Sequence, residues 1–131
     1  MATITNGIVQ EYTLLHAVGT TGSPHTSKAI RVAGARRISF AFSRANHSSG
    51  SSVFEVEVSL DGSTYVTFNK LVQNVANTNT QEITRASSVT LSSDTTELWS
   101  MDLTYDCPLY VRVKATVNTD GDATAKMVVE Y

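Results

Sequence analysis

Two stretches near the C-terminal end alternate apolar and polar residues, and this pattern constrains the fold more than any other feature of the chain. Every second residue is apolar in 109–117 (LYVRVKATV), and 123–131 (ATAKMVVEY) repeats the pattern, with Val128 as an apolar exception on the polar side. Successive side chains of a β-strand point to opposite faces, so this period predicts strands with one buried face. We expect the two strands to form a long antiparallel pair joined by a turn at 118–122.

Two further strands are predicted at residues 37–43 and 53–60, which show the same alternation. The second is followed by Asp61-Gly62, a dipeptide that favours the positive φ angles of a tight hairpin, so we expect the chain to turn there and return through residues 65–68. The positions expected to face the core are Ile38, Phe40, Phe42, Phe54, Val56, Val58 and Leu60.

Weaker candidates complete the set. Strands are expected at residues 4–15 (interrupted near Gln10 and Glu11), 27–32, 87–91 and 97–103, whereas the helical spacing of Phe68, Leu71, Val72 and Val75 predicts a helix of no more than two turns. Residues 46–52, rich in Ser and Gly, are expected to form an exposed loop. About eight strands with turn signals roughly every ten residues predict an all-β, antiparallel two-sheet sandwich that is jelly-roll-like.

Length and composition limit the organisation of the chain. A chain of 131 residues has the size of one domain, so we predict a single β-sandwich over 1–131, in which 1–15 form an N-terminal arm or edge strand. A net charge of -2 gives no electrostatic reason to expect nucleic acid as a partner. The sequence shows neither a secretory signal nor an apolar run of membrane-span length, so we expect no membrane partner and synthesis in a reducing cytoplasm. A single cysteine, Cys107, excludes an intramolecular disulfide.

No group of residues has the spacing of a catalytic or metal site. The histidines have no i, i+4 pairing and no acidic neighbour at the spacing of metal ligands, and the thiol lacks a nearby base. The strand carboxylates are expected to face solvent. The loop aspartates are explained by turn formation, because they lack the series of spaced acidic residues that binds calcium. The residues considered are His16, His25, His47, Glu55, Glu57, Asp61, Asp120, Asp122 and Cys107. We therefore predict a non-enzymatic protein with no catalytic residues, cofactor or metal.

Two features are typical of binding surfaces. A basic cluster, followed one strand later by Arg44, suits an acidic protein surface better than nucleic acid, because no aromatic residues are interleaved with it. Its members are Lys28, Arg31, Arg36 and Arg37. Trp99 serves either as a core residue, which we favour, or as an exposed platform on which a sugar ring stacks.

Three segments carry a resemblance to a known group of proteins. SLDGSTYVTFNKL around Asp61, NVANTNTQEITRASSVTL (74–91) and LYVRVKATVNTDGDATAKMVVEY (109–131) together resemble the small virion structural proteins of tailed bacteriophages. The resemblance covers roughly residues 37–131 and lies in the order of strands and turns rather than in functional residues. It implies a β-sandwich or jelly roll that decorates the head or belongs to the tail apparatus.

The expected function is that of a capsid decoration protein, which binds and stabilises the capsid lattice in a virion assembled in the cytoplasm of a bacterial host. Its expected partners are the major capsid protein or other virion proteins and further copies of itself, with a trimer as the expected oligomer. The alternative is a carbohydrate- or receptor-binding sandwich of a tail or adhesin, with a glycan as ligand.

Overall fold

The computed structural model describes residues 8–77, 80–101, 103 and 108–131, and these residues form strands and loops without a helix. The strands are β1 (Val9–Val18), β2 (His25–Thr26), β3 (Ile30–Arg31), β4 (Arg37–Ala45), β5 (Ser52–Ser59), β6 (Val66–Thr67), β7 (Lys70–Asn77), β8 (Thr80–Ala86), β9 (Val89–Leu91), β10 (Thr95–Met101), β11 (Tyr110–Val117) and β12 (Asp122–Glu130).

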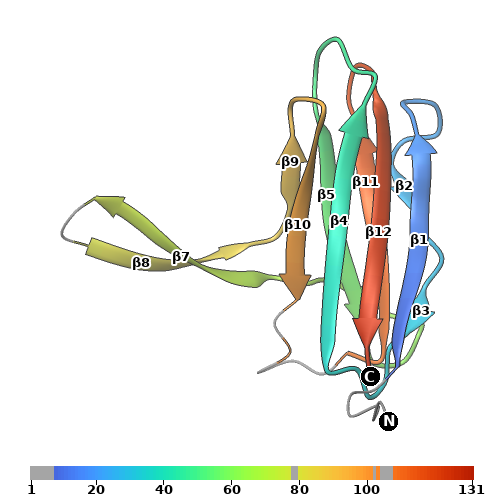
Figure 1. Ribbon diagram of the computed structural model, residues 1–131, viewed down its shortest axis with the longest axis vertical. Helices are drawn as coiled ribbons and strands as arrows, with labels where there is room; N and C mark the ends of the chain where they lie inside the picture. The colour runs from blue at the N-terminus through green and yellow to red at the C-terminus, as the bar shows by residue number, and fades with distance from the viewer. Residues whose placement is uncertain (1–7, 78–79, 102, 104–107) are drawn as a thin grey trace, which may run out of the picture.

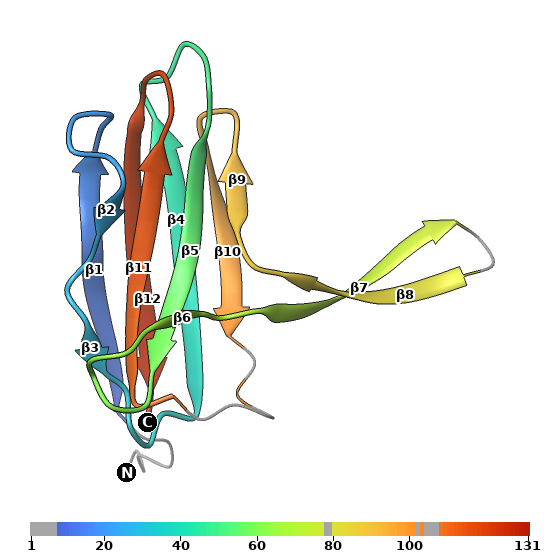
Figure 2. The same cartoon turned by 180° about the vertical axis from the view of Figure 1, so that it is seen from behind.

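The strands form two antiparallel sheets that face each other, together with a separate two-stranded ribbon (Figures 1 and 2). Sheet A has the order β1-β12-β4-β10. Sheet B has the order β2-β11-β5-β6, with β3 also on β11 and β9 also on β5. The ribbon consists of β7 and β8, which pair with each other. The prediction of an all-β, two-sheet antiparallel sandwich is confirmed.

The connections identify a jelly roll. β2 and β3 pair with opposite halves of β11, and β6 and β9 pair with opposite halves of β5, so each couple fills one strand position. Counted in this way, the positions run 1-8-3-6 in sheet A and 2-7-4-5 in sheet B. The chain changes sheet at every connection except that between positions 4 and 5, which is the winding of a jelly roll. The expectation of about eight strands therefore holds for strand positions.

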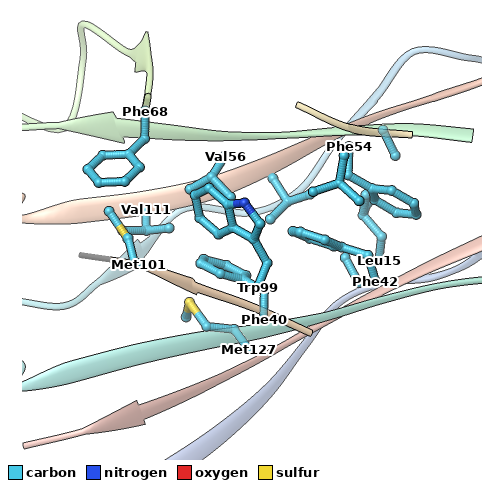
Figure 3. Packing of buried hydrophobic residues seen from close by; sticks show 14 of the residues in the cluster. Leu15, Phe40, Phe42, Phe54, Val56, Phe68, Trp99, Met101, Val111 and Met127 are labelled. Carbon is cyan, nitrogen blue, oxygen red and sulfur yellow. The ribbon is translucent and has the colours of Figure 1, made fainter. Parts of the chain in front are cut away.

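The core lies between the sheets and is centred on aromatic rings (Figure 3). Phe42 and Phe54, from opposite sheets, stack with their ring centroids 4.7 Å apart. Phe68 meets Trp99 edge to face at 5.9 Å. Such pairs contribute about 0.5–1.5 kcal/mol each beyond the area they bury. Trp99 is only 7% exposed, which confirms the preference for a core position.

The expected pairing of the last two long strands is wrong. β11 and β12 have the predicted alternation, with every second residue buried and Val128 exposed, but β11 lies in sheet B and β12 lies in sheet A. The intervening loop contains Thr119 and Gly121 at φ angles of 72° and 103° and carries the chain across the core. The alternation identifies which face of a strand is buried. The same alternation results whether the next strand in sequence lies in the same sheet or in the opposite sheet.

The hairpin after β5 exists, but its turn is wider than predicted. β6 pairs with β5 through Val66 and Val58, so residues 59–65 form the loop, and within it Gly62, at 78°, has a positive φ angle whereas Asp61 does not. The loop is held by hydrogen bonds to side chains, because the Asp61 carboxylate accepts the amides of residues 63 and 64. Leu60, predicted to face the core, is 70% exposed as part of this loop.

Two further expectations need correction. The residues with helical spacing fall in or just before β7, so the predicted short helix is wrong: the β-branched valines of that segment favour an extended strand. β1 is continuous through Gln10 and Glu11, and its register shifts lie on either side of Leu15 instead. β1 forms an edge of sheet A. Residues 1–7 and Cys107 lie outside the described residues, so the arm and the thiol stay predictions.

Candidate functional site: interaction surfaces

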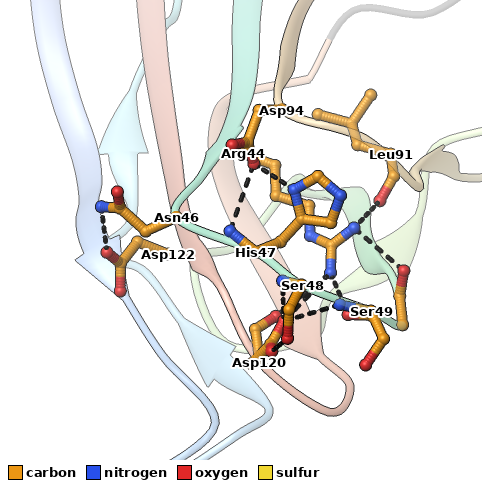
Figure 4. Close-up of polar contacts among 10 residues, drawn as sticks. Arg44, Asn46, His47, Ser48, Ser49, Leu91, Asp94, Asp120 and Asp122 are labelled. Carbon is orange, nitrogen blue, oxygen red and sulfur yellow. Dashed lines mark hydrogen bonds and ion pairs between the residues drawn. The ribbon is translucent and has the colours of Figure 1, made fainter.

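Of the titratable residues singled out from the sequence, His47, Asp120 and Asp122 lie together in or next to the loops at one end of the sandwich, and the other described ones are dispersed over the fold (Figure 4). His16 is exposed on β1, the ring of His25 lies 2.8 Å from the carbonyl oxygen of Gly19, and His47 contacts Asp94 in a loop at one end of the sandwich. Within the part of the chain that the structure describes, no group of three or more histidines, cysteines and carboxylates is placed to hold a metal ion. The described ranges also contain no helix of the length and hydropathy that crossing a bilayer requires.

Arg44 is buried and links the β4–β5 loop, the β11–β12 loop and the end of β9, so it does not extend a basic surface patch (Figure 4). Its guanidinium donates to the carbonyl oxygens of Ser49 at 2.6 Å and Gly50 at 2.9 Å, and to those of Asp120 at 3.2 Å and Leu91 at 3.4 Å. The Asp120 carboxylate lies 3.8 Å away and is partly exposed, so the backbone carbonyls are the principal partners. This cation shapes the β4–β5 and β11–β12 loops.

Two aspartates predicted to be turn residues have that role. The Asp120 carboxylate accepts the hydroxyl of Ser48 and the amides of Ser48 and Ser49, and these bonds lower its pKa to about 2. The Asp61 carboxylate accepts amides from its own loop, which lowers its pKa to about 2 as well. Hydrogen bonds from amides stabilise the ionised form, so both groups are charged over a wide pH range and act as anchors of loops.

The outer face of sheet B is covered by polar contacts. Glu57 accepts a 2.7 Å hydrogen bond from Arg112, whose guanidinium lies 3.8 Å from the centroid of the Tyr65 ring. The 59–65 loop lies over this face, since a Cβ at Gly62 would come within 3.2 Å of the Tyr110 ring. Glu57 is thus paired with a cation on this face, and the loop that contains Asp61-Gly62 packs on its own sheet.

The outer face of sheet A is more open. Ala41, Ser39 and Ser43 of β4 lie there between Ser100 of β10 and Lys126 of β12. Leu98, beside Ala41 in the ladder, is 79% exposed and is the most exposed of the large hydrophobic residues described. Single exposed apolar residues are common on protein surfaces, so this face is a candidate interaction surface because it adjoins β10, the strand that ends the order of sheet A.

β10 and the β7–β8 ribbon lie on the same side of the molecule. β10 ends the order of sheet A, and its seven residues pair with β4 without a register shift. The ribbon starts from the neighbouring edge of sheet B and projects away from the sandwich on that side (Figures 1 and 2). A regular edge strand and a projecting ribbon both present unpaired backbone groups, and both are candidates for intermolecular pairing.

Sequence reasoning missed two of these features, although signals for both were present. Arg44 has the same parity as Phe40 and Phe42, so the alternation places it on the inner face. The ribbon is marked by two β-rich stretches on either side of residues 77–80, Asn-Thr-Asn-Thr, which are turn-forming residues. The basic cluster at 28–37 includes Arg37, which is exposed and paired with Glu130 at 2.8 Å.

Comparison with known protein families and with curated proteins finds no match. Among solved structures, the crystal structure of the SPBc2 prophage-derived protein YomS is similar, with a TM-score of 0.66 and 18% sequence identity over 100% of both chains. At this identity the likeness establishes a shared fold, which extends over the full length of both chains.

Proposed function

We propose that the chain is a non-enzymatic structural protein of a bacteriophage virion, and more narrowly a capsid decoration protein. The observation that carries the proposal is the jelly roll shared over its full length with a prophage-derived protein. The resemblance of residues 37–131 to tailed-phage virion proteins, which rests on the sequence, points in the same direction. Fold alone does not define function, so the surfaces carry the rest of the proposal.

The surfaces suit adhesion between proteins. Among the residues that the structure describes, no group of histidines, cysteines and carboxylates is placed to hold a metal ion, whereas one side of the molecule presents the edge strand β10 and the projecting ribbon, next to the open face of sheet A. In this proposal each subunit contacts neighbouring capsid subunits and further copies of itself. Binding to the assembled lattice then stabilises the lattice by mass action, with no chemical step. Nucleic acid and membrane have no part in it.

The carbohydrate-binding alternative loses the feature that motivated it. A stacking platform requires an exposed aromatic face, and Trp99 lies in the core between Phe40 and Phe68. Tyr65 has one face covered by Arg112. A glycan would have to bind through other residues, so we give the virion structural role precedence.

The proposal is tested by mixing the purified protein with capsids that lack it, from the phage that encodes the chain, and sedimenting the particles. We expect the protein to sediment with the capsids at a saturable ratio and to raise the temperature at which the shells disrupt. Bovine serum albumin in place of the protein controls for trapping in the pellet. Failure to bind any capsid form, expanded or unexpanded, would reject the decoration role.

A further inference from the structure

The β7–β8 hairpin is an insertion that the jelly roll does not require. β6 and β9 both pair with β5 and together fill one strand position, and the chain leaves the sandwich between them. A continuous strand would complete sheet B as well. The hairpin spans residues 70–86 and is inserted between β6 and β9, where a short connection would be enough to complete the fold. An insertion of this size points to a role outside the fold.

In the part of the chain that the structure describes, the two strands of the hairpin pair with each other and with no third strand. Both views show the hairpin extending away from the two sheets (Figures 1 and 2). An isolated hairpin is marginally stable in water, and a third strand or a packing surface is needed to stabilise it. Its sequence contains aliphatic and β-branched residues and neither glycine nor proline, so it has the composition of a strand that pairs.

β10 provides a matching edge. It has seven residues, against eight in β7 and seven in β8, and it contains no proline, glycine or bulge to prevent pairing. The other edges are less suitable: β1 has two register shifts, and both edges of sheet B are built from short, interrupted strands. Leu98 is 79% exposed on β10, and a partner lying along this edge would cover it.

The charges of the two elements are opposite. Residues 70–86 contain Lys70, Arg85 and Glu82, so two basic residues less one acidic residue give +1. Residues 92–101, which include β10, contain Asp94 and Glu97 and no basic residue, which gives -2. An approach of the hairpin to β10 of another copy is therefore favoured electrostatically, and two β10 strands would repel each other.

We propose that the β7–β8 hairpin of one copy of this chain lies along the β10 edge of a second copy and covers Leu98. The inference deepens the self-association in the proposed function and rests on it to that extent. Because the hairpin and the β10 edge lie on the same side of the molecule, each copy donates one hairpin and accepts another around a common axis. The contact explains both the projecting ribbon and the exposed leucine.

The size of the contact indicates a closed oligomer. A strand of eight residues is roughly 26 Å long and a two-stranded ribbon is roughly 10 Å wide, so one contact buries roughly 500 Å² counted on both partners. Stable interfaces bury about 1,200 Å² or more. One hairpin contact is too small alone, whereas the two contacts that each copy makes in a closed dimer or trimer bury roughly 1,000 Å², which is about the lower limit for a specific interface.

Two variants and one matched control test this contact. In the first, residues 70–86 are replaced by Asn-Gly; in the second, Leu98→Lys places a positive charge where the hairpin would lie. Leu60→Lys is the control, because Leu60 is 70% exposed in the 59–65 loop over sheet B. Molar mass is measured by light scattering during size-exclusion chromatography over a range of concentrations, and circular dichroism checks that each variant is folded.

We expect the wild type and Leu60→Lys to be oligomers of a fixed multiple of 14.1 kDa and the hairpin variant to be a monomer. Leu98→Lys should raise the dissociation constant at least about tenfold, as for a central interface residue. A monomeric wild type, or an unchanged mass for Leu98→Lys, overturns the inference, and so does an unchanged mass for the hairpin variant. If that variant does not fold, Leu98→Lys alone decides. Oligomers that depend on the hairpin but do not bind capsids would reject the virion role and keep this contact.

Discussion

Replacing Arg44 by methionine should destabilise the protein by about 3 kcal/mol, although the residue is an arginine next to an exposed loop. Its side chain is fully buried, and its guanidinium donates to four backbone carbonyl oxygens. Methionine has a similar length and fills the space without donors. The loops at this end of the sandwich would then lose the group that fixes their relative positions (Figure 4).

The expected loss of stability follows from the hydrogen bonds lost, reduced by the cost of burying the charged guanidinium, which the methionine variant no longer has. A hydrogen bond from a charged donor contributes about 1.5–3 kcal/mol, but one of the four is long at 3.4 Å, and carbonyls in surface loops recover water after the substitution. Arg44 itself is desolvated at a cost, and its Nε atom has no hydrogen-bond partner. The net loss of about 3 kcal/mol corresponds to a fall in Tm of about 10 °C for a domain of this size.

Arg37→Met is the matched control, since it removes an arginine from the same strand. Arg37 is 74% exposed and forms one ion pair with Glu130, so its loss should leave Tm nearly unchanged. Thermal and urea unfolding followed by circular dichroism give both values. If Arg44→Met is within about 1 kcal/mol of wild type, or if the two variants are destabilised equally, the buried network does not stabilise the fold as argued.

Three other predictions concern the core and the loops. Gly50→Ala should lower the free energy of unfolding in urea by about 2 kcal/mol more than Gly34→Ala does. Both glycines have positive φ angles, but a Cβ at Gly50 would lie 2.4 Å from a backbone oxygen, whereas a Cβ at Gly34 meets open space. NMR titration of the Asp61 and Asp120 carboxylates should give midpoints near pH 2. Because their pKa in the folded protein is below the ordinary 3.8, the ionised carboxylates stabilise the fold fully above about pH 4, and this stabilisation is lost as the pH falls toward 2. Midpoints near 3.8 would contradict the loop hydrogen bonds. The fluorescence of Trp99, the single tryptophan, should be blue-shifted in the native protein and shift to the red on unfolding in urea; native emission like that of a water-exposed indole would show that the residue is outside the core.

The sequence predicts the buried faces of this protein well because a face depends on local alternation. Phe40 and Phe42 are buried as their parity requires, and the same holds along the whole of β11 and β12. Strand pairing is a different matter. An antiparallel hairpin and an arch that crosses between sheets leave the same alternation, so the sheet to which β12 belongs cannot be deduced from its own residues.

The candidate surfaces were less predictable, because they depend on how distant segments meet. The charge of Arg44 groups it with surface bases, but its parity with Phe42 places it inside, where carbonyls of two loops and of Leu91 in β9 surround it. Leu98 is exposed because it lies on the outer face of sheet A, opposite in parity to the buried Trp99, and its nearness to a sheet edge is a fact of topology rather than of composition. The β7 segment was misassigned because a helical spacing of apolar residues over eight positions is too short to exclude a strand.

The measurement that tests the central claim most directly is the quantitative mass spectrometry of purified particles of the phage that encodes this chain. We expect the protein to be present in intact virions at a copy number comparable with that of the major capsid subunit. Its presence at only a few copies per particle would indicate a tail protein rather than a component of the head lattice. Its absence from purified particles would contradict the virion structural role.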